Sequence, residues 1–288
     1  MVLGLSVPVL AESCSRFSKM CPYIEVFERK IATYGIMMGF GCLAAVTVSM
    51  FRCKRKGLKA DDMLYFFAFI LVFAGAGAKL WYVIQHLPQF LRNRALIFES
   101  ARSFLTYLGG GFVFYGGLLG GCCGAFLYAH FFGENSVALA ENFTVSVPLF
   151  HCFGRIGCFL TGCCYGIEYE GVFSVVYHES PVAENGIGYF PVQPVEAGVN
   201  LILFFILLLA TDRLKKPLQN FGLYAILYSI LRFFLEFLRG DEIRGMIGPL
   251  TVSQWCGMLV ILPLGVYMFC CDPEKNFITR KLLLGSLK

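Results

Sequence analysis

The chain has 288 residues, of which 57% are hydrophobic and only 15% carry a charge, and its formal net charge is +5. Soluble domains carry about 25% charged residues, so this composition excludes a soluble globular protein and a disordered chain. The small net charge gives no reason to expect a nucleic-acid partner. The sequence therefore predicts a single polytopic membrane domain over residues 1–288.

Seven apolar segments are candidates for membrane-spanning helices, each of which needs about 20 residues. They cover residues 33–51, 63–85, 105–132, 143–160, 197–210, 221–238 and 250–271. The third segment is long and glycine-rich, and the fifth is short. The pattern predicts an all-α integral membrane protein with seven transmembrane helices.

The basic residues predict how these helices are oriented, because Lys and Arg concentrate in cytoplasmic loops. The loops after the first and fifth segments and the C-terminal tail are basic. Residues 156–212 contain no Lys or Arg but five Glu. This predicts an exported loop between spans four and five, an N-terminus outside and a C-terminus in the cytoplasm.

The thirteen cysteines are odd in number, lie mostly in apolar stretches and include adjacent pairs such as Cys163-Cys164. These features predict free thiols rather than a disulfide framework. The four histidines do not lie at the spacing of metal ligands. We therefore expect no metal site and no cofactor.

Charged side chains inside the predicted spans are candidates for function, since each costs about 2.5–3.5 kcal/mol at the centre of a helix. Arg155 lies in a glycine-rich run with Gly154, Gly157, Gly162 and Gly166. Such glycines let backbones approach closely, so the arginine is expected to face protein rather than lipid. It either forms a buried salt bridge or binds an anion that enters from the bilayer.

The sixth segment carries Tyr228, Arg232, Glu236 and Arg239, whose spacings of four, four and three place them on one helical face. Arg232 and Glu236 can pair within the helix. Their pair either holds the helices together or orients an arginine toward a phosphate, which a guanidinium binds well.

Two further features have two interpretations each. Gln193 and Glu196, at the start of the fifth segment, either cap that helix or line a site. Residues 109–121 contain seven glycines, each costing up to about 1 kcal/mol against alanine in a helix. They favour either tight helix packing or a substrate pressed against bare backbone.

The blocks in this order resemble the bacterial prolipoprotein diacylglyceryl transferases over nearly the whole chain. Tyr34-Gly35 is similar to the Tyr-Gly of that family's first span, and Tyr115-Gly116-Gly117-Leu118 to the His-Gly-Gly-Leu of its third. Residues 154–166 resemble the family signature Gly-Arg-x-Gly-Asn-Phe-x-Asn-x-Glu-x-x-Gly. Residues 190–196 resemble its His-Pro-x-Gln-x-x-Glu, and residues 232–239 its final Arg-x-x-x-Glu-x-x-Arg.

The resemblance implies an enzyme of the bacterial cytoplasmic (inner) membrane. Such an enzyme transfers a diacylglyceryl group from phosphatidylglycerol to the lipobox cysteine of exported prolipoproteins and so forms a thioether. The implied partners are phosphatidylglycerol, lipobox-bearing prolipoprotein signal peptides and membrane lipid, with no nucleic acid and no cofactor.

The resemblance also implies the site residues. The implied catalytic residues are Arg155, Arg232, Tyr115 and Tyr34. The implied substrate-binding residues are Arg239, Glu236, Gln193, Glu196, Gly116, Gly117, Gly154, Gly157, Cys158 and Gly166.

The chain departs from the family pattern at Tyr115, which replaces the histidine, and at Cys158, Thr161 and Cys163, which replace the signature Asn, Asn and Glu. The identity of the general base therefore stays open. Two other hypotheses remain. One is a paralog of the same fold that binds or transfers a lipid without lipobox modification. The other is a membrane thiol redox protein built on Cys158, Cys163 and Cys164.

Overall fold

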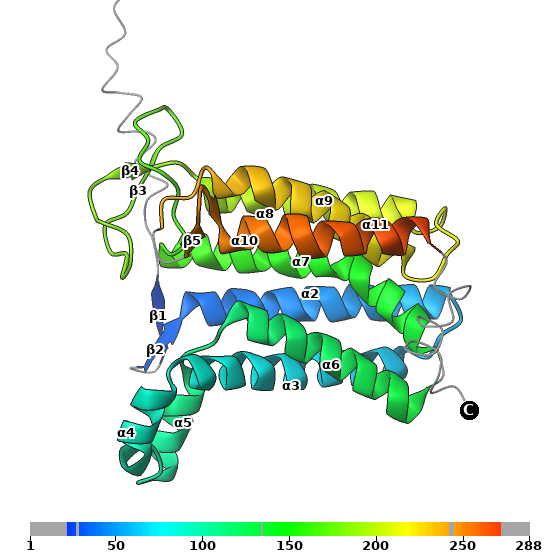
Figure 1. The fold of residues 1–288 in the computed structure, drawn as a ribbon, viewed down its shortest axis with the longest axis horizontal. Coiled ribbons are helices and arrows are strands. Elements are labelled where there is room, and N and C mark those ends of the chain that lie inside the picture. Colours follow the sequence, from blue (N-terminus) through cyan, green and yellow to red (C-terminus); the bar gives the residue numbers. More distant parts are fainter. Residues whose placement is uncertain (1–21, 27–28, 134, 242–244, 272–288) are drawn as a thin grey trace, which may run out of the picture. The chain divides into compact units, whose positions relative to one another are not determined.

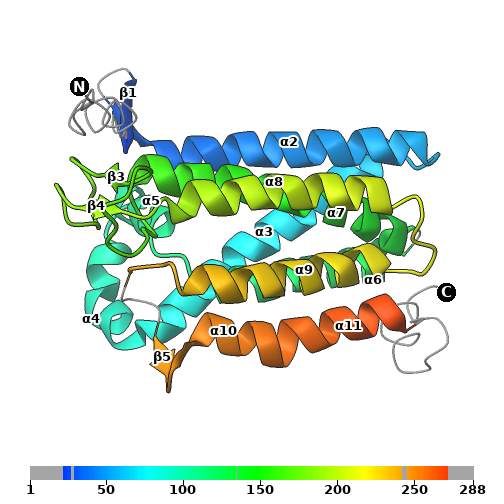
Figure 2. The ribbon, with the colours of Figure 1, turned by 90° about the horizontal axis from the view of Figure 1, so that it is seen from above.

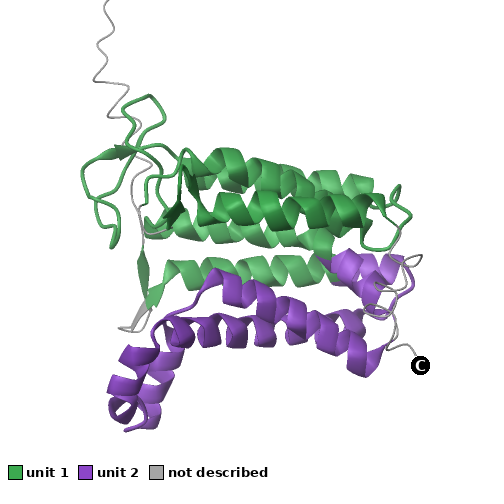
Figure 3. Cartoon of the chain, viewed as in Figure 1, with its two compact units in different colours: residues 1–49, 144–272 green, residues 50–143, 273–288 purple. Residues whose placement is uncertain are grey.

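A computed structural model of the chain describes residues 22–26, 29–133, 135–241 and 245–271. These residues are mostly helical and fall into two compact units (Figures 1 and 3). Unit 1 contains residues 1–49 and 144–272, and unit 2 contains residues 50–143 and 273–288. Most of the basic tail that we expect in the cytoplasm lies outside the described residues.

Unit 1 contains most of the helices of the chain and three short antiparallel hairpins. Its helices are α2 (Thr33–Arg55, up to residue 49), α7 (Ser136–Thr161, from residue 144), α8 (Val192–Ala210), α9 (Gln219–Glu236), α10 (Val252–Cys256), the π-helical η3 (Gly257–Ile261) and α11 (Leu262–Cys270). Its hairpins pair β1 (Tyr23–Val26) with β2 (Arg29–Ala32), β3 (Val175–Val176) with β4 (Gly188–Tyr189), and β5 (Met246–Ile247) with β6 (Leu250–Thr251).

Unit 2 contains the end of α2, the beginning of α7 and four helices between them. These are α3 (Ala60–Gln85), α4 (Leu87–Ile97), α5 (Ala101–Gly109) and α6 (Phe114–Phe132). Helix α6 packs along α3. A core of buried side chains holds this unit together, namely Cys53, Met63, Phe66, Tyr128 and Leu139.

Each of the seven predicted apolar segments lies mainly on helices, although the third includes the non-helical residues 110–113 and the seventh begins with the strand β6. Five helices are long and apolar enough to cross a membrane: α2, α3, α7, α8 and the continuous run of residues 252–270. The bent pair of α5 and α6 makes a sixth if it is one span. Helix α9, which carries Arg232 and Glu236, does not belong to this set. The chain is therefore a multi-pass membrane protein, whereas seven spans and their orientation stay predictions.

The third predicted span is wrong as a single helix, because α5 and α6 meet at an angle of 96°. Gly111 adopts a φ of +70°, which ends the helical path. Lys79 of α3 donates hydrogen bonds to the carbonyls of Tyr107 and Gly110 at the break. The Val113 amide donates to the Ala78 carbonyl at 3.2 Å. Polar groups of α3 thus replace the helical hydrogen bonds that the break removes.

Beyond the break, the glycines of α6 lie against the backbone of α3. A Cβ atom at Gly116 would lie 2.4 Å from the Gly77 carbonyl oxygen, and one at Gly120 would lie 2.1 Å from the Phe73 carbonyl oxygen. Small residues allow this close approach between helices in a membrane. Tight packing therefore explains Gly116 and Gly120.

We expect Gly116→Ala to destabilise unit 2 by about 1–3 kcal/mol, since the new methyl group overlaps backbone that cannot move independently. The measurement is the midpoint of thermal unfolding in detergent. Gly117→Ala is the matched control, because its Cβ would meet Ala78 Cβ at an ordinary 3.5 Å. Equal midpoints for the two variants would contradict this packing.

In unit 1, apolar contacts and one polar contact fix α7 against its neighbours. Val145 of α7 and Phe204 and Leu207 of α8 form a buried cluster. Side chains of α2 and α9 pack against this cluster. The hydroxyls of Ser49 and Ser146 lie 2.8 Å apart in a buried hydrogen bond between α2 and α7. These contacts align the helices that carry the site.

Candidate active site

Three helices of unit 1 bring charged side chains to one level. Arg155 lies six residues before the end of α7, Glu196 four residues after the start of α8, and Arg232 four residues before the end of α9. At 1.5 Å per residue these positions are about 6–9 Å from the respective helix ends. The three ends lie on the same side of unit 1, next to β3, β4 and β5 (Figures 1 and 2). The three residues therefore lie at similar distances from the same side of unit 1.

The carboxylate of Glu196 is the centre of this group. Its Oε2 atom lies 2.5 Å from Nη2 of Arg155 and 3.4 Å from Nη1 of Arg232. The side chain of Glu196 is only 1% exposed. Arg232 also contacts Oε2 of Glu236 at 2.7 Å, as predicted for a pair within one helix. Two guanidinium groups on different helices therefore converge on one buried oxygen atom.

The second oxygen of Glu196 faces His151 and Tyr228. The Tyr228 hydroxyl donates to Oε1 at 3.3 Å, and Nε2 of His151 lies 3.8 Å from the same atom. The N-cap of α8 is Pro191, which receives no side-chain capping bond. Glu196 therefore contacts charged and polar side chains of α7 and α9 and is not the N-cap of α8. Sequence reasoning placed Tyr228 on the polar face of α9 and left His151 out of the site.

The charges of this group balance, since two arginines face the carboxylates Glu196 and Glu236. The Nε atom of Arg155 is nevertheless buried without a hydrogen-bond partner among the described residues. A guanidinium is a planar fork of donors that matches the oxygens of a phosphate. The arrangement can therefore bind an anion when one arginine turns part of its fork away from Glu196.

Gln193 fixes the loop between α7 and α8 to the start of α8. Its Nε2 atom donates to the Cys163 carbonyl at 2.9 Å and to the Tyr177 hydroxyl at 2.8 Å. Burial raises the pKa of Tyr177 to about 12, so this hydroxyl stays protonated at physiological pH. Gln193 thus acts on the loop and not as a cap of α8.

The prediction that Arg239 shares a helical face with Arg232 and Glu236 is wrong. Helix α9 ends at Glu236, and the next residues form tighter turns, with the Leu238 amide donating to the Leu235 carbonyl at 3.1 Å. The guanidinium of Arg239 instead binds Asp241, with contacts of 3.1 and 2.9 Å. Sequence reasoning missed Asp241, although the Arg-x-Asp spacing was a signal for it.

Gly166 lies where three backbone segments meet. It forms an antiparallel bridge with Arg239, and the Ile167 amide donates to the Leu238 carbonyl at 3.0 Å. The Phe190 amide donates to the Ile167 carbonyl at 2.9 Å from the other side. This pairing ties the ends of α7 and α9 to the start of α8.

We expect Gly166→Ala to lower activity at least tenfold and to destabilise the protein by about 1–3 kcal/mol. The new Cβ would lie 2.3 Å from the Phe190 carbonyl oxygen and 3.0 Å from that of Leu238, so the three segments must separate. Transferase rate and thermal unfolding are measured together. Gly154→Ala is the control, because its nearest neighbour is Met38 Sδ at 3.4 Å. A harmless Gly166→Ala would refute this role.

Gly157 and Tyr34 lie at the contact between α7 and α2. A Cβ at Gly157 would lie 3.1 Å from Cδ2 of Tyr34 and 3.2 Å from Cβ of Met37. The phenol of Tyr34 interacts electrostatically with Arg155 and Cys158. A catalytic role for Tyr34 stays a prediction.

The cysteines of the described residues are free thiols, as predicted. Cys158 is buried in the last turn of α7, and Nη1 of Arg155 donates a weak hydrogen bond to its Sγ at 3.9 Å. Cys163 and Cys164 follow directly after the helix.

Tyr115, Gly116 and Gly117 lie on α6 in unit 2. Gly116 and Gly117 face α3. Tyr115 is half-buried, and its ring contacts that of Phe114. A role for these three residues in catalysis or substrate binding stays a prediction.

Comparison with known proteins identifies the family. The family model of the prolipoprotein diacylglyceryl transferases matches residues 23–271. A phosphatidylglycerol–prolipoprotein diacylglyceryl transferase of Clostridium tetani is 34% identical over 249 residues, 86% of this chain and 96% of the relative. Transferase 2 of Clostridium perfringens is 33% identical over 88% of this chain and 95% of the relative. An enzyme of Dehalococcoides mccartyi with the same name is 30% identical over 85% and 92%. This chain belongs to the prolipoprotein diacylglyceryl transferase family.

Proposed function

We propose that this protein transfers a diacylglyceryl group from phosphatidylglycerol to the thiol of a lipobox cysteine in exported prolipoproteins. The sulfur forms a thioether with the glyceryl carbon, and glycerol phosphate leaves. The two clostridial relatives are named for phosphatidylglycerol and for prolipoprotein, the donor and the acceptor of this reaction. This chain matches them over 96% and 95% of their lengths. The observation that carries the proposal is the convergence of Arg155 and Arg232 on one buried carboxylate oxygen.

The two arginines bind the phosphate of the lipid. The leaving phosphate gains negative charge as the bond between carbon and oxygen breaks, and fixed guanidinium donors stabilise that charge best in a site without bulk water. Glu196 holds both guanidinium groups in place before the lipid arrives, and Glu236 holds Arg232 from the other side. Preorganised donors of this kind need little rearrangement during the reaction.

The other predicted residues act around this centre. Arg239 and Gly166 keep the ends of α7 and α9 in register through their backbone bridge, and Gln193 fixes the loop that the acceptor peptide must pass. Gly157 lets α7 lie close to α2, and Gly154 faces Met38 of α2 without close contact. Tyr34 contributes its hydroxyl beside Arg155. For Tyr115, Gly116 and Gly117, which lie on α6 in unit 2, a role in the reaction is proposed from the family resemblance alone.

The enzyme works in the bacterial cytoplasmic membrane. Its N-terminus and the loop between α7 and α8 face outward, because residues 156–212 lack Lys and Arg. The site can then reach both substrates, which are phosphatidylglycerol in the bilayer and the lipobox of an exported precursor at the outer edge of the bilayer.

The test is a reaction of the purified full-length protein with phosphatidylglycerol and a lipobox peptide, scored by mass spectrometry. The expected product is the peptide with a diacylglyceryl thioether, and a peptide with serine at the lipobox position gives none. Lipid binding without product would favour the paralog hypothesis instead. Reduction of a disulfide-linked peptide dimer by the protein's thiols, without thioether, would favour the redox hypothesis, for which the gathering of Cys158, Cys163 and Cys164 is the supporting observation.

A further inference from the structure

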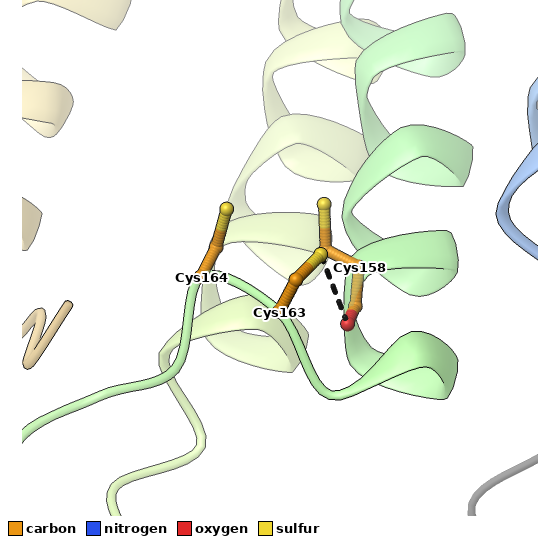
Figure 4. Close-up of side chains that lie close together, drawn as sticks. All are labelled: Cys158, Cys163 and Cys164. Carbon is orange, nitrogen blue, oxygen red and sulfur yellow. Dashed lines mark hydrogen bonds between the residues drawn. The ribbon is translucent and has the colours of Figure 1, made fainter. Parts of the chain in front are cut away.

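Three cysteine thiols gather beside the last turn of α7 (Figure 4). The Sγ atoms of Cys158, Cys163 and Cys164 all lie within 4.8 Å of one another. Tetrahedral zinc with bonds of about 2.3 Å to sulfur places its sulfur ligands about 3.8 Å apart. The thiols therefore need to approach by at most about 1 Å, which small side-chain rotations supply.

The backbone holds these thiols together. Gly162 and Cys164 both adopt positive φ angles, +75° and +55°, so the chain turns back on the end of α7. The Cys163 amide donates to the Cys158 carbonyl at 3.1 Å. A non-glycine residue rarely adopts the left-handed conformation of Cys164 without support from its surroundings. The turn thus presents two adjacent thiols to a third one on the helix.

The loop around the turn is also fixed. Gln193 Nε2 donates to the Cys163 carbonyl at 2.9 Å, and Ser180 Oγ donates to the Gly162 carbonyl at 2.9 Å. Preorganisation of ligands by surrounding hydrogen bonds is what metal sites require. Among the residues that the structure describes, no fourth His, Cys, Asp or Glu ligand atom joins the three thiols.

A positive charge lies against one of these thiols. Nη1 of Arg155 donates to the sulfur of Cys158 at 3.9 Å. Three thiolates and one divalent ion carry a net charge of −1, and the guanidinium of Arg155 lies against one of the three sulfurs. Soft thiolate ligands select zinc and related soft ions over magnesium or calcium.

The acceptor thiol needs to lose its proton before it attacks, since the thiolate is the nucleophile. Glu196 and Glu236 do not offer an available base, because they are engaged with Arg155 and Arg232. A zinc site with three protein ligands and one open position is the catalytic form of such a site, and a thiol that binds zinc is deprotonated.

We propose that Cys158, Cys163 and Cys164 bind one zinc-class divalent ion and that its fourth position takes the acceptor thiol as thiolate. This inference rests on the proposed function. On coordination the acceptor thiol releases its proton to water. The bound thiolate then forms the bond between sulfur and the glyceryl carbon as the bond between that carbon and the phosphate oxygen breaks. The electron pair leaves with glycerol phosphate, whose charge Arg155 and Arg232 stabilise.

The first test is metal binding to the full-length, reduced and chelator-treated protein in detergent. Titration with Cd²⁺ is followed through the ultraviolet charge-transfer absorption of cadmium thiolates, and Zn²⁺ competes in a second titration. We expect one tight equivalent per chain. Its affinity should fall at least tenfold in Cys163→Ser and in Cys164→Ser, and it should persist in the controls Cys42→Ser and Cys152→Ser.

The titration of the wild-type protein tests metal binding by itself, so a folding defect in a variant does not affect that test. Absence of a tight equivalent in the wild-type protein would overturn the proposal. Persistence of that equivalent in both folded variants, Cys163→Ser and Cys164→Ser, would overturn it too.

The second test asks whether the ion binds the acceptor. Protein loaded with Co²⁺ is titrated with the lipobox peptide, and we expect its visible absorption to change with the cysteine peptide and not with the serine peptide. Thioether formation should fall at least tenfold after chelation and return with Zn²⁺. A tight site whose removal leaves thioether formation unchanged would overturn the activating role while the proposed function stands. Absence of thioether under every metal condition would overturn the proposed function, and the titration would still decide the metal site.

Discussion

Replacing Glu196 with glutamine is expected to lower the free energy of unfolding by about 3–5 kcal/mol, the usual cost of removing one partner from a buried ion pair. Glutamine keeps the shape of the side chain but not its charge. In the native protein the Glu196 carboxylate lies 2.5 Å from Arg155 and 3.4 Å from Arg232. In the variant these two positive charges face each other across a neutral amide. Reversible unfolding in detergent and denaturant measures the effect.

Glu170→Gln is the matched control for this change, because Glu170 is exposed in the loop between α7 and α8. Its stability should differ from wild type by less than about 0.5 kcal/mol. In the double variant Glu196→Gln with Arg155→Gln, removal of one of the two facing charges should restore part of the loss. Purely additive losses in that double variant would show that the two residues do not interact.

The second large effect is expected on catalysis. Arg155→Lys should lower kcat about 10²–10³-fold, the usual effect of removing one donor that stabilises charge in a transition state. Lysine keeps the positive charge and the pairing with Glu196. It lacks the planar fork, however, and therefore the Nε donor that the described residues leave without a partner.

Initial rates of thioether formation over a range of phosphatidylglycerol concentrations separate the effects on kcat and KM. Arg213→Lys is the control, because Arg213 is exposed after the end of α8, outside the site. We expect the control to keep the wild-type rate. A variant Arg155→Lys with wild-type kcat and only a raised KM would assign Arg155 to binding of the ground state instead.

The helices of this protein could be predicted because long apolar runs have few alternatives in a membrane. The ends of helices depended on details that hydropathy does not contain. Helix α8 begins at Val192, before the predicted start at residue 197, because Pro194 lies in the first turn, where a proline needs no amide partner. This earlier start is what brings Glu196 into the helix and level with Arg155.

The break in the third predicted span could not be predicted from hydropathy. Residues 105–132 read as one apolar segment, yet Lys79 and Ala78 of α3 supply the partners that make a break at Gly111 stable. These partners are about thirty residues away in sequence. Glycine content indicated that the segment was unusual, but only the packing of α3 and α6 decided between a kinked helix and a continuous one.

For the site, the cost of burying charge was the most informative signal. It selected Arg155, Arg232 and Glu236, which the structure places in one group around Glu196. The same signal failed for Arg239. Helix α9 ends at Glu236, and Arg239 instead pairs with the backbone of Gly166, which is distant in sequence. The signal also left out His151, whose contact with Glu196 is formed only when α7 and α8 pack.

The most direct test of the account compares binding of phosphatidylglycerol with binding of diacylglycerol, which has the same acyl chains but no phosphate. Native mass spectrometry of the purified protein gives both dissociation constants. We expect the wild-type protein to prefer phosphatidylglycerol at least tenfold, and the double variant Arg155→Gln with Arg232→Gln, folded by its thermal unfolding, to lose that preference. An unchanged preference in the folded double variant would show that these arginines do not bind the phosphate.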